Sequence, residues 1–217
     1  MSRRTAMIAI SPTTSGQWGM ITAGQARGLG VSRQDLKRLI DDGTLVVADQ
    51  ATRVYRLAGA PEDPERDPLR AAWLQLGGAK PWHERTAGIP DAVISHRSAA
   101  HLRGLGDLIP HEHEFFTAKR LRPRRTDIKL RVRSHLGPDS WELWDGLPTR
   151  TVPAIIDDLL ADGEDESAVA QVVWDALNLG LLHRDELDVI AASHAAAYGH
   201  PDSGTFAQLL AGDGPTR

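Results

Sequence analysis

The pattern of apolar and polar positions is clearest between residues 16 and 58. Apolar residues recur at helical intervals over 22–30 and again over 32–43. Two short β-rich runs follow, at 45–47 and 54–57, and a polar, turn-prone segment joins them. The pattern predicts two short helices followed directly by a β-hairpin.

The ends of the two helices carry recognisable start and stop signals. Thr22 is followed three residues later by Gln25, which predicts a capping box at the first helix. Ser32 and Asp35 repeat this spacing at the second helix. Gly30 and Gly43 suit the position just after each helix, where glycine is favoured. A tight, glycine-containing turn between two short helices is typical of a helix-turn-helix.

The flanking segments extend this pattern to about sixty residues. A first helix is expected before Gly16 and a short strand over 18–21. The order helix, strand, helix, helix, strand, strand is that of a winged helix, with residues 49–53 as the wing. We therefore expect a winged helix-turn-helix domain at residues 1–60.

The remaining chain predicts a second, larger domain. Residues 61–66 lie in the Pro- and acid-rich sequence GAPEDPERDP and are predicted to form a linker. Residues 67–217 are expected to form a mixed α/β, helix-rich domain, so that the fold class is α+β. Strands are predicted at HEFFTA and IKLRVRSH, a strand and a loop in WELWDGLPTRT, and an irregular segment in KPWHERTAGIPDAV. Helices are predicted near 67–76, 96–103, 153–161, 166–179, 184–197 and 203–211.

Charge is distributed unevenly along the chain. The net charge is −4, but residues 1–133 carry 22 basic and 14 acidic side chains, whereas residues 134–217 carry 3 and 15. This polarity favours a front part that contacts a polyanion. Solvated, acidic helix faces explain the rear equally well. The chain has no cysteine, and no apolar run approaches membrane length, so we expect a cytoplasmic protein without a membrane partner.

The second helix of the helix-turn-helix pattern is the candidate DNA-reading element. Successive residues turn by about 100°, which separates its apolar positions from a cationic face. Residues near its start contact base edges in such motifs, and its amino end attracts phosphate. Asp41 and Asp42 lie at its far end and weaken the electrostatic attraction. The candidate DNA-binding residues are Ser32, Arg33, Gln34, Lys37 and Arg38, with Arg53 in the wing. A protein-contact module is the alternative for such a helix pair.

A second basic segment lies between and within the two predicted strands of the larger domain. Eight of the fifteen residues 119–133 are basic, against one acid, Asp127. Three interpretations stay open: a second nucleic-acid contact, a surface for an acidic partner, or a solvated hairpin. The candidate contact residues are Lys119, Arg120, Arg122, Arg124 and Arg125.

Motifs for catalysis are weak. His111 and His113 share one face of a predicted strand, but a third metal ligand is not identifiable. A metal-dependent nuclease needs converging carboxylates and a nearby lysine. Asp107, Glu114 and Lys119 match no tight motif of this kind. The sequence also has no Gly-rich phosphate loop and no nucleophile elbow. We expect a non-enzymatic protein without cofactor or metal.

The stretch GMITAGQARGLGVSRQDLKRLIDDGTLVVADQATRVYRL resembles the winged-helix domain of AbiEi-type antitoxins from abortive-infection toxin–antitoxin pairs. The GVSR turn at 30–33, the basic helix, the G-x-L step at 43–45 and the RVYRL strand at 53–57 occur in the family's order. The segments at 92–110, 146–160 and 176–187 resemble parts of the family's second domain. The resemblance covers roughly residues 14–195. Asp41 and Asp42 depart from it, because relatives are often basic there.

This resemblance implies a function. Members of the family repress their own operon by binding promoter repeats, and they neutralise a cognate nucleotidyltransferase toxin, with the second domain implicated. By this resemblance the DNA partner is the chain's own promoter and the protein partner is the toxin. The departure at Asp41 and Asp42 weakens DNA binding by a single domain, so a second copy on the DNA, or help from residues 119–133, becomes more important. Two alternatives stay open: a stand-alone winged-helix regulator with a partner-sensing domain, and a nucleic-acid-processing enzyme.

Overall fold

The computed structural model describes residues 1–48, 53–122 and 125–212, which divide into two compact units. Unit 1 comprises Met1–Ala92 together with Arg122–Arg125. Unit 2 comprises Val93–Leu121 and Thr126–Arg217. Both units contain helices and strands, and the fold is a mixed α+β fold.

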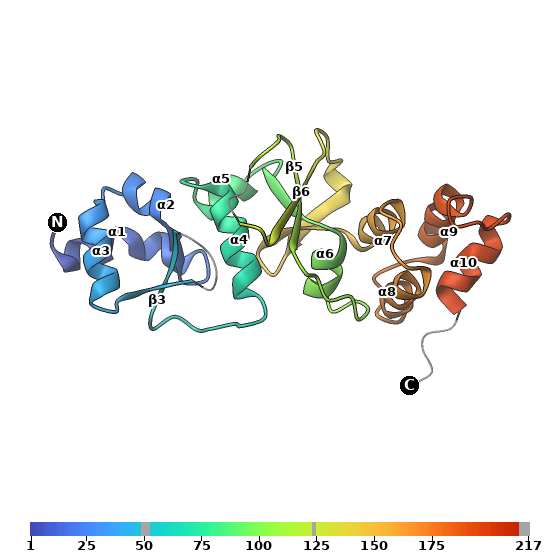
Figure 1. Ribbon diagram of the computed structural model, residues 1–217, viewed down its shortest axis with the longest axis horizontal. Helices are drawn as coiled ribbons and strands as arrows, with labels where there is room; N and C mark the ends of the chain where they lie inside the picture. The colour runs from blue at the N-terminus through green and yellow to red at the C-terminus, as the bar shows by residue number, and fades with distance from the viewer. Residues whose placement is uncertain (49–52, 123–124, 213–217) are drawn as a thin grey trace. The chain divides into compact units, whose positions relative to one another are not determined.

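The first part of unit 1 has the predicted order of elements (Figure 1). They are α1 (Arg3–Ser15), β1 (Met20–Thr22), α2 (Ala23–Gly28), α3 (Arg33–Asp41), β2 (Leu45–Val47) and β3 (Val54–Leu57). The strands form a three-stranded antiparallel sheet in the order β1-β3-β2. The tip between β2 and β3, residues 49–52, lies outside the described residues. The predicted helices, strands and hairpin pairing are therefore confirmed.

The predicted helix caps explain where α2 and α3 begin. Thr22 and Gln25 form the complete capping box, since each side chain accepts a hydrogen bond from the other residue's backbone N–H. At α3 the Ser32 hydroxyl accepts from the Asp35 N–H, as expected. The Asp35 carboxylate instead accepts from the Ser32 hydroxyl at 2.5 Å. The apolar faces of α1, α2 and α3 then meet in a core that includes Ile10, Ala26, Leu36, Leu39 and Leu45.

Unit 1 extends well beyond the predicted boundary near residue 60. It also contains α4 (Asp67–Gly77) and α5 (Trp82–Thr86), which were assigned to the second domain or to an irregular segment. The Thr22 hydroxyl donates to the Gly78 carbonyl, and Gln25 Nε2 donates to the Lys80 carbonyl at 2.9 Å. A Cβ on Gly24 would lie 2.9 Å from the Gly78 oxygen, so the two backbones approach closely. These contacts join residues 78–80 to β1 and α2 within unit 1.

Unit 2 contains a five-stranded mixed sheet. Its elements are β4 (Ala92–Ile94), α6 (His96–Leu102), β5 (His113–Thr117), β6 (Ile128–Val132), a 3₁₀ turn (Pro138–Ser140), β7 (Trp141–Trp144) and β8 (Leu147–Arg150). The strand order is β6-β5-β4-β8-β7. Strands β5 and β6 pair in parallel, so the interpretation of 119–133 as a hairpin is wrong. Parallel neighbours cannot be joined by a tight hairpin turn and need a crossover connection.

A hairpin does occur later in the sheet, where the sequence predicted only a strand and a loop. Strands β7 and β8 pair antiparallel, with Trp144 opposite Leu147. The two residues between them, Asp145 and Gly146, have φ angles of +50° and +77°. An Asp-Gly pair in this conformation matches the favoured two-residue hairpin turn.

Four helices complete unit 2 and confirm the predicted helical tail (Figure 1). They are α7 (Val152–Ala161), α8 (Glu166–Asn178), α9 (Arg184–His194) and α10 (Ser203–Gly212). Helix α7 packs against α6, α8 and α9, and α10 packs against α8 and α9. Among the described residues, no helix combines the length and the apolar character needed to cross a bilayer.

Candidate nucleic-acid interface

Helix α3 buries one face and exposes the residues predicted to contact DNA. Leu36 and Leu39 are buried in the core of unit 1. Arg33, Gln34, Lys37 and Arg38 are all exposed, on the side that the helical spacing predicted. Ser32 is exposed as well, but its hydroxyl is engaged in capping the helix. The predicted polar face therefore exists and is accessible.

The cations of this face differ in their partners. Lys37 Nζ lies 2.6 Å from one Asp41 carboxylate oxygen and 2.8 Å from the other. Arg38 lies 3.3 Å from an Asp35 oxygen. Within the described part of the chain, the Arg33 and Gln34 side chains form no hydrogen bond or ion pair. Free donors are thus concentrated in the first turn of α3.

Asp35 in the first turn of α3 and Asp42 directly after the helix are each held by several groups. The Ser32 hydroxyl, the Met1 ammonium and Arg38 together keep the pKa of Asp35 below its usual value. Asp42 accepts hydrogen bonds from the hydroxyl and the N–H of Thr44, and it pairs with Arg3 at 3.2 Å. These hydrogen bonds lower the pKa of Asp42. Both carboxylates are therefore fully charged at neutral pH.

Arg53 lies at the start of β3, next to the undescribed tip. Its side chain is exposed, and its φ of +69° is in the left-handed region. This conformation costs a non-glycine residue about 1 kcal/mol. Its carbonyl accepts from the Ala23 N–H at 2.9 Å, which ties the hairpin to the start of α2. The structure places an exposed cation where the sequence analysis put the wing.

The second basic segment divides into two groups with different surroundings. Lys119, Arg120 and Arg122 are exposed. Arg125 is half-buried, and Arg124 lies outside the described residues. Lys129, Arg131 and Arg133 on and beside β6 instead pair with acids. Asp127 is the one acid within residues 119–133, and the compensating acids Glu114, Asp158 and Asp162 come from other parts of the sequence.

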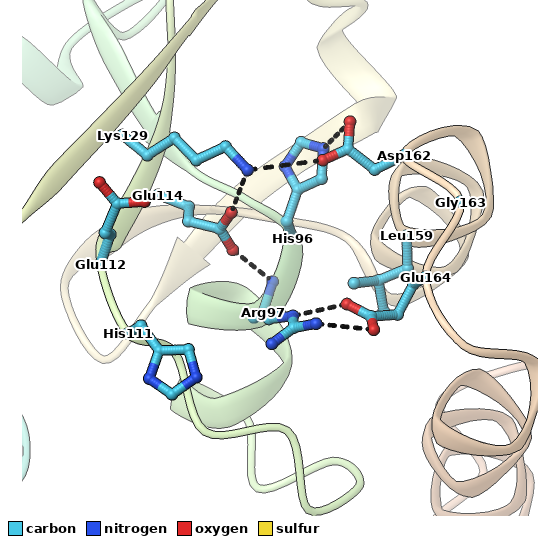
Figure 2. Close-up of a pocket in the computed structure, with 10 residues that line it drawn as sticks. All are labelled: His96, Arg97, His111, Glu112, Glu114, Lys129, Leu159, Asp162, Gly163 and Glu164. Carbon is cyan, nitrogen blue, oxygen red and sulfur yellow. Dashed lines mark hydrogen bonds and ion pairs between the residues drawn. The ribbon is translucent and has the colours of Figure 1, made fainter.

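Of these charged residues, Glu114, Lys129 and Asp162 line a pocket of about 260 Å³ in unit 2 (Figure 2). Glu114 is buried and accepts from the Arg97 N–H at 2.9 Å and from Arg131 at 3.1 Å. Lys129 Nζ lies 3.6 Å from Glu114 and 3.9 Å from Asp162. Arg97 and Glu164 form a two-point ion pair at 2.5 and 2.7 Å, as Figure 2 shows. Charge is largely balanced within the cluster, which joins β5, β6 and α6 to the end of α7.

His96 is the most unusual residue of this pocket. It is buried directly after β4 with a φ of +51°, and its Nδ1 lies 2.9 Å from the Ser95 hydroxyl. Burial, together with the positive charge of Arg131, lowers the pKa of His96 to about 3. The ring is therefore neutral at physiological pH. The sequence does not predict this buried, left-handed position, since nothing in HRSAAHL signals a left-handed backbone.

The residues of the nuclease and metal alternatives are not assembled into a metal site. Asp107 and Lys119 are exposed, whereas the Glu114 carboxylate is occupied by cations. His111 lies at the pocket, and His113 is 3.9 Å from Asp127. Over residues 1–48, 53–122 and 125–212, no group of three or more His, Asp or Glu side chains is arranged to hold a metal ion.

Comparisons with known proteins concern the fold. No protein-family model matches the chain, and no curated protein sequence matches it. Among solved structures, the crystal structure of the RV2827C protein from Mycobacterium tuberculosis is similar, with a TM-score of 0.52 and 16% sequence identity. The similarity covers 99% of this chain and 83% of that one. At this identity the likeness extends to the mixed α+β fold and not to function.

Proposed function

We propose that the chain is a sequence-specific DNA-binding protein without enzymatic activity, and that residues 1–60 form a winged helix-turn-helix domain. One observation carries the proposal. Helix α3 buries Leu36 and Leu39 and presents Arg33 and Gln34 at its amino end, where both are exposed and have no partner among the residues that the structure describes. The β2–β3 hairpin that follows α3, and the three-stranded sheet that it completes with β1, support the same assignment.

The proposed mechanism uses α3 as the helix that enters the major groove. In helix-turn-helix proteins the first residues of this helix contact base edges. Arg33 is suited to donate two hydrogen bonds to a guanine, and Gln34 to pair with an adenine. Arg53 then contacts a phosphate beside the groove, which fixes orientation without reading sequence. Lys119, Arg120 and Arg122 are candidates for a further phosphate contact.

A binding titration with the DNA directly upstream of the chain's own gene tests this assignment. Because a two-point base contact contributes about 1–3 kcal/mol of discrimination, Arg33→Ala should weaken binding about tenfold. Binding to an unrelated duplex of equal length should weaken less. Arg184→Ala removes an exposed cation of α9 and serves as the matched control. Equal affinities for wild type and Arg33→Ala would exclude this role of α3.

We further propose that DNA binding serves autorepression in a toxin–antitoxin pair, with a nucleotidyltransferase toxin as the protein partner. The resemblance of residues 14–195 to AbiEi-type antitoxins supports this role. Co-expression of the chain with the product of the adjacent gene should then restore growth that the product alone arrests. An adjacent gene that encodes no nucleotidyltransferase favours a stand-alone regulator instead.

A further inference from the structure

The two ends of α3 offer DNA very different charges. At the amino end, Arg33 is exposed and has no intramolecular partner within the described chain. At the carboxyl end, Lys37 is paired with Asp41, and Arg3 of α1 is paired with Asp42 at 3.2 Å. The positive charge that the sequence suggests for this face is therefore neutralised over its second half.

The ion pairs at the carboxyl end are exposed and geometrically simple. The Lys37 and Asp41 side chains are 70% and 57% exposed, and the pair has the i, i+4 spacing of a helix surface. Such exposed pairs are weak, so DNA can compete with Asp41 for Lys37. Asp42 is more firmly placed because Thr44 also donates to it twice.

Competition between aspartate and DNA for these cations weakens contacts to phosphate more than contacts to base edges. Contacts to phosphate provide the sequence-independent part of the affinity, and contacts to base edges provide the discrimination. A lysine or arginine that must leave a carboxylate gains less from a phosphate, and the carboxylate that remains repels the DNA backbone. Arg33 and Gln34 have no carboxylate partner to leave among the described residues, so neither effect weakens their contacts with DNA.

We infer that Asp41 and Asp42 limit the sequence-independent attraction of this surface for DNA by holding Lys37 and Arg3 in intramolecular ion pairs. The inference rests on the proposed DNA-binding function. If the chain binds DNA in this way, the two aspartates at the end of a basic helix increase the specificity of DNA binding. The protein is kept from strong binding at unrelated sites, and the base contacts of the first turn provide the larger share of its preference.

The test compares the full-length chain with Asp41→Asn, which keeps the side-chain shape and removes the charge. Affinity for an unrelated duplex should rise about twofold or more, by at least the strength of the lost pair. The plot of log affinity against log salt concentration should steepen by up to about 0.9, the value for one added phosphate contact. Glu65→Gln removes one exposed acid elsewhere in unit 1 and should change neither quantity.

A second variant assigns the gain to Lys37. In the Asp41→Asn background, Lys37→Ala should return affinity and salt dependence to the wild-type values. The inference is overturned if Asp41→Asn binds the unrelated duplex with the same affinity as the wild type. It is also overturned if the variant gains affinity for the upstream DNA alone. The proposed function fails separately, through the Arg33→Ala titration. An intact Arg33 effect with no Asp41 effect rejects the inference alone.

Discussion

The carboxyl end of α3 and the contact between the end of β8 and α7 are built from the same kinds of charged side chains but differ in exposure. Lys37 and Asp41 pair in water, with more than half of each side chain exposed. Arg150 and Asp158 pair at 2.7 Å with 3% and 0% exposure. An exposed pair exchanges partners at little cost, whereas a buried one cannot lose a member without leaving a charge in a medium of low polarity. Burial therefore decides whether such charges remain available to a ligand.

The largest effect is expected from breaking the buried pair. Asp158 accepts from Arg150 through both oxygens and from Arg133 at 3.2 Å. Asp158→Asn leaves the Arg150 charge buried without its counter-charge, which should lower the free energy of unfolding by about 3–5 kcal/mol. Urea denaturation followed by circular dichroism measures this change. A loss below about 1 kcal/mol would show that the buried pair is no stronger than an exposed one.

An intermediate effect is expected from pH, through His96. Its pKa of about 3 lies below the ordinary value of 6.5, so the folded chain favours the neutral ring. That contribution to stability is complete above pH 6.5 and is lost as pH falls from 6.5 towards 3. Between pH 7 and pH 5 the loss should be about 2 kcal/mol.

The substitution His96→Asn isolates this contribution, because asparagine tolerates the left-handed backbone better than most residues. The variant should lose about 2 kcal/mol less than wild type between pH 7 and pH 5 in urea denaturation. The exposed His135 provides the control, and His135→Asn should leave the wild-type pH dependence unchanged. Identical pH dependence in wild type and His96→Asn would contradict the burial of a neutral ring.

The smallest effect is expected at the exposed pair. Asp41→Asn should change the free energy of unfolding by less than about 0.5 kcal/mol, because the pair is solvated and removes no buried contact. The same urea denaturation measures this change beside Asp158→Asn. If Asp41→Asn lowers the free energy of unfolding as much as Asp158→Asn does, α3 depends on this pair for its fold. The exposed pair and the buried pair would then not differ in their contribution to stability.

The sequence predicts local structure in unit 1 well because the signals there are local. Helical spacing and the caps at Thr22 and Ser32 place α2 and α3 within a few residues. The exposure of Arg33 and Gln34 follows from the same spacing. Prediction from the sequence fails where the residues that contact one another are distant in the chain. The position of α4 and α5 in unit 1 depends on contacts of Thr22 and Gln25 with residues 78–80, which no local pattern encodes.

The same limit explains the misinterpretation of the basic segment. Eight cations in fifteen residues suggest one continuous basic surface, yet Lys129, Arg131 and Arg133 meet acids from β5 and α7. The parallel pairing of β5 and β6 sets this arrangement, and strand direction is not visible in alternation alone. Lys119, Arg120 and Arg122 alone of the described candidates match the expected exposed surface.

The position of β6 at the end of the sheet has a consequence for aggregation. An edge strand presents unpaired backbone groups that can pair with another chain, and charged side chains, lysine above all, discourage this. Strand β6 has the sequence IKLRV, in which Lys129 and Arg131 interrupt three β-favouring apolar residues. Lys129 is 46% exposed. The cations that balance Glu114 and Asp162 therefore also disfavour strand pairing between β6 and another chain.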